Sequence, residues 1–173
     1  MIVRAFAASL FALLLVSSHA SAQTLPDSIA GIAFLIGDWH GDGTSEGGMT
    51  NQGTSSIHLI VGGNALLRRD HTDVTDKTGK LQESFDQVML IYPEGGTLHA
   101  DYLDGAHVIH YAKATVSPGV SVMFESASGT GAPVFHLTYT KTDADTLGIA
   151  FEMQPPGAPK FVTVASGSVH RDK

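Results

Sequence analysis

The histidines are the residues of this sequence best suited to chemistry. Nine of the 173 residues are histidine, which is the commonest metal ligand and the usual proton carrier near neutral pH. The closest pair, His107 and His110, is three residues apart in an expected strand, so the two rings point to opposite faces and cannot share a metal without a bulge. The four-residue spacing of helical zinc motifs is absent. We therefore predict no metal site and assign no catalytic residue.

Two histidines are candidates for the interior of the fold. With Lys113 placed in solvent, Ile109 and Tyr111 also face outward and His110 faces inward, because side chains alternate along a strand. The strand that contains His136 can alternate in two ways, which its residues favour equally, and in one of them His136 also faces the interior. Each is either a contact to a bound ligand or a hydrogen-bonded core histidine.

The only tryptophan, Trp39, is a further candidate. It stands in the segment Phe34–Gly43 (F-L-I-G-D-W-H-G-D-G), where glycines leave room for other groups to pack closely on the indole. A large aromatic side chain at the narrow end of a barrel closes the core, so a structural role comes first. Trp39 and Met89 complete the set of candidate ligand contacts in the lumen.

Other polar residues are predicted to lie on solvated strand faces. His71, Asp73 and the second arginine of the pair Arg68–Arg69 share one face, which predicts a surface ion network. An anion or metal site is the alternative. The arginine pair as a whole is expected to be solvated, as are His40 and His58.

Composition excludes several classes of partner and stabilising bond. Ten Lys and Arg against 17 Asp and Glu give a net charge of −7, without basic clusters. Nucleic acids and anionic lipid surfaces are therefore poor partners, because both are bound through Lys and Arg. The absence of cysteine excludes disulfide bonds, so stability must come from core packing.

The first 22 residues resemble an export signal. Arg4 precedes the apolar run Ala5–Val16, and Ala20–Ala22 is a small-residue cleavage pattern. The run is shorter than the roughly 20 residues that span a bilayer, although an uncleaved anchor is the alternative. We expect residues 1–22 to be removed, and residues 23–173 to form one domain in the periplasm or outside the cell, free of the membrane.

The rest of the chain predicts a short helix followed only by strands. The helix lies within residues 24–36, with Asp27 positioned to cap it and Gly37 to end it. Period-two patterns rich in β-branched and aromatic residues then predict ten strands. These are residues 38–45, 53–61, 65–74, 83–92, 97–103, 106–115, 119–126, 134–140, 146–154 and 160–170.

The connections between these strands are short turns rich in Gly, Pro, Asp and Asn. Such links join only antiparallel neighbours, because a parallel crossover needs about a dozen residues. We therefore predict an all-β, up-and-down antiparallel barrel, since closure removes exposed strand edges. A Greek-key sandwich of the jelly-roll kind is the alternative.

Some strands carry apolar residues on both faces, as in Asp86–Tyr92. Alternation alone predicts a polar outer face. One explanation is that the helix or a second subunit covers part of the outside, and a second subunit would make the protein a homodimer. The other is that the lumen contains both polar and apolar side chains.

The segment Phe34–Gly43, followed by this meander, resembles the lipocalin-like barrels of the nitrobindin type. The shared residues are Phe34, Leu35, Gly37, Trp39, Gly41 and Gly43. The resemblance implies haem bound in the barrel through a histidine of the last strand, and action on nitrogen oxides. The only histidine of the corresponding stretch here is His170, near the chain end, so no haem ligand is carried over.

Three functions follow from these expectations. The first is an exported barrel that binds a small apolar or amphipathic ligand in its lumen, with no reaction assigned. The second, implied by the resemblance, is a haem protein in which His110 or His136 replaces the missing ligand. The third is a non-catalytic interaction protein that uses its outer face.

Overall fold

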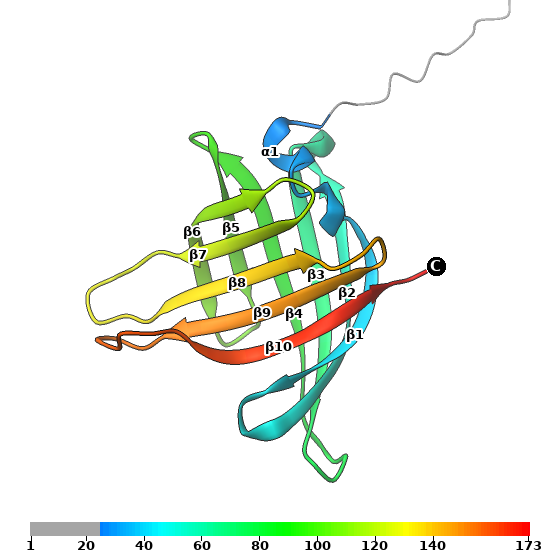
Figure 1. Cartoon of the computed structure of the whole chain (residues 1–173), viewed down its shortest axis with the longest axis vertical. Helices are drawn as coiled ribbons and strands as arrows, with labels where there is room; N and C mark the ends of the chain where they lie inside the picture. Colours follow the sequence, from blue (N-terminus) through cyan, green and yellow to red (C-terminus); the bar gives the residue numbers. More distant parts are fainter. Residues whose placement is uncertain (1–24) are drawn as a thin grey trace, which may run out of the picture.

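Ten antiparallel strands form a closed barrel (Figure 1). The computed structural model describes residues 25–173, apart from the side chains of residues 45 and 46, so the predicted signal peptide lies outside the described residues. The strands are β1 (Gly37–Ser45), β2 (Met49–Ile60), β3 (Ala65–Thr75), β4 (Leu81–Glu94), β5 (Thr97–Leu103), β6 (Val108–Ser117), β7 (Ser121–Ser126), β8 (Val134–Lys141), β9 (Thr146–Gln154) and β10 (Val162–Arg171).

The barrel closes through its first and last strands. Every strand pairs with its neighbours in sequence, and β1 also pairs with β10, from Trp39 opposite Arg171 to Ser45 opposite Ala165. Neither terminal strand therefore keeps an open edge along this stretch. The predicted up-and-down barrel is confirmed, and the jelly-roll alternative is wrong because it requires non-sequential pairs other than the one between the first and last strands.

The ten predicted strands match the ten described ones in order. The largest difference in bounds is in β2, which begins at Met49 instead of Gly53, and β4 runs two residues further at each end than predicted. The β1–β2 and β3–β4 hairpins extend beyond the other strands at the lower end of Figure 1.

A short helical segment closes the opposite end of the barrel, which we call the pole (Figure 1). It consists of α1 (Asp27–Ala30) and a 3₁₀ turn (Ala33–Leu35). Ile29, Ile32 and Leu35 are fully buried in the core. Their spacing suits a tight turn of about three residues, so all three side chains enter the barrel.

The helical segment differs from its prediction. A single helix capped by Asp27 is wrong, because α1 ends after one turn and Asp27 makes no capping hydrogen bond. Pro26 occupies the N-cap position, so Asp27 is already the first helical residue. Gly37 follows the segment with φ of 145°, and a Cβ there would overlap the guanidinium of Arg171.

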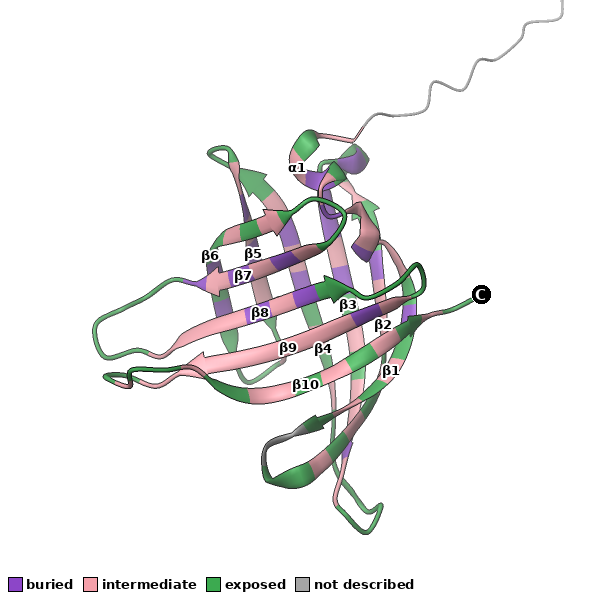
Figure 2. Ribbon diagram, viewed as in Figure 1, coloured by how far each residue is buried: buried purple, intermediate pink, exposed green. Residues whose placement is uncertain are grey.

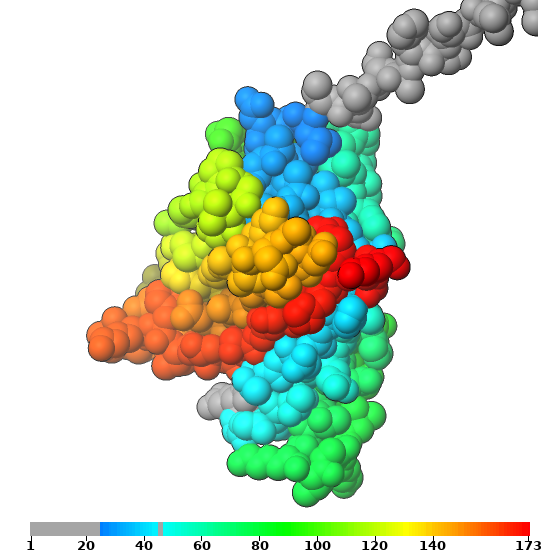
Figure 3. Space-filling view, turned by 45° about the vertical axis from the view of Figure 1, so that its right-hand side comes forward, coloured from blue at the N-terminus to red at the C-terminus, as the bar shows by residue number. Residues whose placement is uncertain are grey.

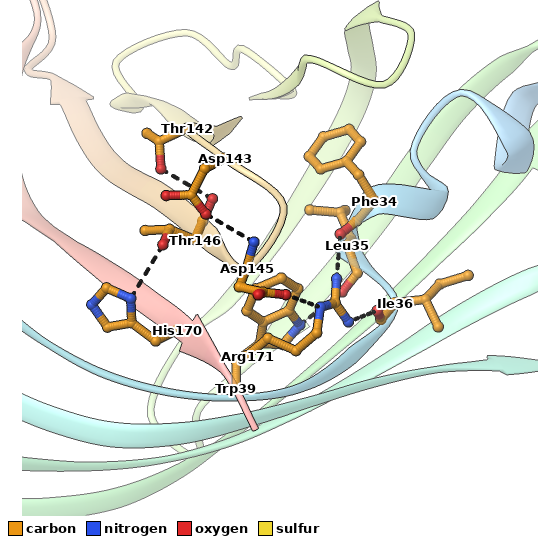
Figure 4. Close-up of polar contacts among 10 residues, drawn as sticks. All are labelled: Phe34, Leu35, Ile36, Trp39, Thr142, Asp143, Asp145, Thr146, His170 and Arg171. Atoms are coloured by element: carbon orange, nitrogen blue, oxygen red, sulfur yellow. Dashed lines mark hydrogen bonds and ion pairs between the residues drawn. The ribbon is translucent and has the colours of Figure 1, made fainter. Parts of the chain in front are cut away.

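Trp39 seals the pole from inside the barrel (Figure 4). It is 1% exposed, and its Nε1 donates to the carbonyl oxygen of Leu35 at 2.9 Å. The guanidinium of Arg171 lies over the indole with Cζ 4.0 Å from the ring centroid, and its Nη1 donates to the carbonyl oxygen of Ile36 at 2.6 Å. Trp39 therefore connects β1, β10 and the helical segment.

The outer faces of β4, β5 and β6 carry exposed apolar side chains. Val88, Leu103 and Val108 lie side by side in register and are between 39% and 57% exposed. The helical segment covers the pole and not these strands (Figure 1). A homodimer formed through this face stays a prediction. No helix within residues 25–173 has the length and apolar character needed to cross a membrane.

Candidate functional site

An ion pair is buried at the centre of the barrel. Arg68 on β3 is 5% exposed, and its Nη2 lies 2.8 Å from Oδ2 of Asp70, the next inward-facing residue. Its Nη1 donates to the hydroxyl of Tyr139 on β8. β8 is five strands from β3 in either direction around the barrel, so the guanidinium reaches the opposite wall.

This placement corrects the prediction that both arginines of Arg68–Arg69 are solvated. Arg69 is exposed, but Arg68 shares the inner face of β3 with the buried Leu66. A buried guanidinium is tolerated where a carboxylate offsets its charge, and Asp70 does so. The lumen is thus mixed in character, which was one of the two explanations for the pattern of the strands.

Two more side chains surround the guanidinium. Gln87 on β4 accepts from Nη2 of Arg68 at 3.1 Å. The ring of Tyr102 on β5 has its centroid 5.7 Å from Cζ of Arg68, within the range of a cation–π contact. Residues from β3, β4, β5 and β8 therefore converge on one charged group.

The charge states of this cluster are fixed by burial and by Asp70. Burial is the largest single influence on the pKa of Arg68 and alone would lower it, but the carboxylate of Asp70 together with the phenols of Tyr139 and Tyr102 outweighs it, and the pKa is raised. Burial raises the pKa of Tyr139, and also that of Tyr111 on β6. Arg68 is therefore a permanent cation, and both phenols keep their protons at physiological pH.

Two polar atoms of the ion pair have no hydrogen-bond partner. They are Nε of Arg68, which is a donor, and Oδ1 of Asp70, which is an acceptor, and both are buried. Leaving such an atom unsatisfied costs about 1–3 kcal/mol. The cluster therefore presents one free donor and one free acceptor inside the barrel.

The ion pair separates two unlike halves of the lumen. On the pole side the side chains are fully buried and form the hydrophobic core. On the other side, which we call the mouth, the strand ends are mostly half-buried or exposed (Figure 2). The inward-facing aromatic residues Phe85, Phe135 and Phe151 there are only half-buried. Phe135 and Phe151 stack with ring centroids 5.6 Å apart. Solvent therefore reaches an apolar, aromatic lining at the mouth.

His110 does not face the lumen, contrary to the prediction. Its side chain is 72% exposed and its Nδ1 lies 2.7 Å from Oδ1 of Asp101, while the flanking Ile109 and Tyr111 are buried. A β-bulge between Tyr111 and Lys113 shifts the alternation, so counting inward from Lys113 gives the wrong face.

His136 also lies outside the lumen. Phe135 and Leu137 take the inner face of β8, which resolves the alternation that the sequence left open. The imidazole stacks on Phe161 with ring centroids 3.9 Å apart, and its Nε2 lies 3.2 Å from Oε2 of Glu125. Its side chain is 15% exposed because Phe161 covers it.

Trp39 and Met89 lie in the interior, as predicted. Met89 is fully buried on β4 and pairs in register with Arg68 on β3, so it belongs to the wall beside the ion pair. Trp39 belongs to the pole. Contact of either residue with a ligand stays a prediction.

The described residues do not fit a haem held by a histidine in the lumen. The eight histidines between residues 25 and 173 lie on outer strand faces or in a turn, and His110 and His136 are among them. The groups that line the interior around Arg68 are instead phenols, an amide, a thioether and the carboxylate of Asp70.

Most of the described histidines form ion pairs with carboxylates. His71 lies 2.9 Å from Asp86 through Nδ1 and 3.4 Å from Asp73 through Nε2, which confirms a surface ion network around His71 and Asp73. The hydrogen bond to Asp86 raises the pKa of His71. His40 and His58 are exposed, as predicted. Within residues 25–173 no group of three or more His, Asp or Glu is arranged to hold a metal ion.

A hollow on the outer surface, of about 460 Å³, lies beside the end of β10. It is lined by His40, Asp145, Thr146, His170, Arg171, Asp172 and Lys173. The turn between β8 and β9 forms one side of it, next to the red end of the chain in Figure 3. Nδ1 of His170 and the hydroxyl of Thr146 share a hydrogen bond of 3.2 Å (Figure 4). This bond connects the end of β10 to the start of β9.

Comparison with known proteins identifies the fold. No protein-family model matches the sequence, and no curated protein matches it. The S-type phycobiliprotein lyase CPES from Guillardia theta matches with a TM-score of 0.51 and 10% identity, over 82% of this chain and 90% of that chain. A barrel named EF1p2_mFAP2b, in a structure bound to DFHBI, matches with a TM-score of 0.47 and 10% identity, over 84% and 99%.

The fold is lipocalin-like. Membership of the nitrobindin family is not shown by these comparisons.

Sequence reasoning missed Arg68 and Asp70 as site residues. One signal was present: continuing the alternation of Leu66 along β3 places Arg68 and Asp70 on the same face as the apolar Val74. The opposite face also carries an apolar residue, Leu67, followed by charged ones. The sequence therefore did not distinguish the inner face of β3 from the outer.

Proposed function

We propose that the mouth of the barrel binds a small amphipathic molecule. The apolar body of the ligand lies against Phe85, Phe135 and Phe151, and its polar group reaches Arg68 and Asp70. The observation that supports this proposal is the pair of buried, unpartnered polar atoms, Arg68 Nε and Asp70 Oδ1, beneath a half-buried aromatic lining.

A purely structural role explains the ion pair poorly. Removing two charges from water costs several kcal/mol per ion, and well-packed apolar residues of similar volume are often as stable or more so. The free atoms of Arg68 and Asp70 add to that cost. A few convergent polar groups next to an apolar lining are typical of small-molecule sites. A ligand that satisfies both atoms offsets the cost of burying them.

A fluorescent probe tests this function. N-phenyl-1-naphthylamine, which is amphipathic and brightens in apolar surroundings, is titrated into the protein. We expect saturation at one probe per chain, and an affinity about tenfold lower in Phe151→Asp, because the new carboxylate is desolvated by a probe at the mouth.

Val108→Asp is the matched control, because Val108 is an exposed apolar residue on the outer face. Both variants are first compared by thermal unfolding. Unchanged binding in Val108→Asp supports a site at the mouth. Loss of binding in Val108→Asp with retention in Phe151→Asp would move the site to the outer face and favour an interaction protein.

We also propose that the protein is exported. The proposal depends on the apolar run and small-residue pattern within residues 1–22. Mass spectrometry of the protein expressed from its full sequence with a secretion-competent host should give a mature chain beginning at Gln23. An intact N-terminus in the cytoplasmic fraction would contradict export and leave the binding proposal unaffected.

A further inference from the structure

We infer that the site selects an uncharged polar group that both donates and accepts hydrogen bonds, such as a primary amide or an alcohol, and disfavours carboxylates and other anions. This inference rests on the proposed function and specifies the chemical class of the ligand. The inference follows from the two atoms that lack a hydrogen-bond partner, Nε of Arg68 and Oδ1 of Asp70.

The charge of Arg68 is already offset before any ligand binds. Asp70 lies 2.8 Å from Nη2 of the guanidinium, and the carboxylate is only 14% exposed. The nitrogens Nη1 and Nη2 are further occupied by Tyr139 and Gln87. An incoming anion therefore meets an ion pair with no net charge, not an uncompensated cation.

The free atoms match a ligand group with two functions. Nε of Arg68 requires an acceptor, and Oδ1 of Asp70 requires a donor. Nε is joined to Nη2 of Arg68 through Cζ, and Oδ1 is joined to Oδ2 of Asp70 through Cγ. Because Nη2 and Oδ2 are in contact, one small group can lie close to both free atoms. A primary amide offers its carbonyl oxygen to Nε and its N–H to Oδ1. An alcohol does the same through one hydroxyl.

A carboxylate fits this arrangement poorly. One of its oxygens can accept from Nε of Arg68, but the group has no proton to donate to Oδ1 of Asp70. Its charge also lies near that of Asp70 in a site from which water is largely excluded, where repulsion between like charges is strong. The acceptor of Asp70 would remain unsatisfied as well.

Three octyl compounds with the same chain test the inference. Octanamide, octan-1-ol and octanoate are each used to displace N-phenyl-1-naphthylamine from the native protein at about pH 8, where the carboxylate is ionised. We expect octanamide to bind more tightly than octanoate by about tenfold or more, because it satisfies both free atoms. Octanoate that binds as tightly as octanamide would overturn the inference while leaving the proposed function intact.

The variant Asp70→Asn should reverse the order. It removes the charge that offsets Arg68, so octanoate should gain affinity and octanamide should lose its advantage. Asp73→Asn is the matched control, since Asp73 lies on the outer face of the same strand beside His71. An unchanged order in Asp70→Asn would also overturn the inference.

The outcomes separate the two proposals. If neither the probe nor any octyl compound binds, the proposed function itself is wrong. If the probe binds at the mouth but the three octyl compounds do not differ, only the inference is wrong. If Asp70→Asn does not fold, the order of affinities in the native protein decides.

Discussion

Two of the arginines within residues 25–173 enter the barrel, and they differ in how completely they are bonded. At the pole, Arg171 donates to the carbonyl oxygens of Ile36 and Phe34, and its Nε lies 3.8 Å from a carboxylate oxygen of Asp145 (Figure 4). At the centre, Arg68 is more deeply buried, yet its Nε has no partner.

This difference separates a structural contact from a candidate binding site. Buried polar groups in folded proteins are nearly always satisfied. Both Nη atoms of Arg171 donate to backbone carbonyl oxygens and its side chain is 30% exposed, so its bonding needs no further explanation. The free atoms of Arg68 and Asp70 do need one, and they lie where the lumen turns from core to half-buried aromatic lining. The same residue type therefore stabilises the fold at one level of the barrel and presents a polar site at another.

The largest expected effect is at the pole. Trp39→Ala should lower the free energy of unfolding by about 3–5 kcal/mol, because a fully packed aromatic side chain is replaced by a cavity. Chemical denaturation monitored by circular dichroism measures the change. A variant as stable as the native protein would mean that Trp39 does not close the core.

Replacing the central ion pair, in contrast, should leave the free energy of unfolding unchanged or raise it. The double variant Arg68→Met with Asp70→Leu should match the native protein or exceed its free energy of unfolding by about 1–4 kcal/mol, because two buried charges are removed together. The same variant should no longer distinguish octanamide from octanoate. A large loss of stability would show that the pair holds the barrel together and would weaken the case for a binding site.

Arg171→Met should be mildly destabilising. The variant leaves the carbonyl oxygens of Ile36 and Phe34 without their donor and removes the cation from the face of Trp39. We expect a loss of about 1–3 kcal/mol in the free energy of unfolding, with probe binding unchanged. Weaker probe binding with no loss of stability would reverse the roles assigned to the two arginines.

The smallest effect concerns an exposed ion pair on the outer surface. The hydrogen bond to Asp86 raises the pKa of His71 above its ordinary value of 6.5. Because the pKa is higher in the folded state, the contribution to stability is present below the ordinary pKa and is lost as pH rises through the raised one. Proton NMR titration should show a lower pKa for His71 in Asp86→Asn, whereas an unchanged value would assign the shift elsewhere.

Much of the fold was predictable because short turns leave few alternatives. Ten runs of period two joined by turn residues permit only antiparallel neighbours, and closure of the first and last strands then follows from the cost of open edges. The pole was predictable because Trp39 stands beside glycines at the start of the first strand. The break after Ala30 was not, since Ile29, Ile32 and Leu35 fit either helical geometry.

The site was less predictable because it depends on which face of each strand is inside. A bulge after Tyr111 reversed the expected orientation of His110, and a bulge leaves no signature in the residues around Lys113. Arg68 was missed because a buried charge depends on its partners, and Tyr139 is 71 residues away in the sequence. Such a contact exists only once β3 and β8 face each other across the closed barrel.

The most direct test of the binding account is an NMR titration of the arginine side chains. The Nε–Hε signals of Arg68 and Arg171 are followed in ¹H–¹⁵N spectra while octanamide is added. We predict that the Arg68 signal moves with the binding curve and that the Arg171 signal stays in place, because the proposed ligand accepts from Nε of Arg68 at the mouth, whereas Arg171 lies beside Trp39 at the pole. Saturable binding that leaves Arg68 unmoved, or that shifts Arg171 instead, would contradict the account.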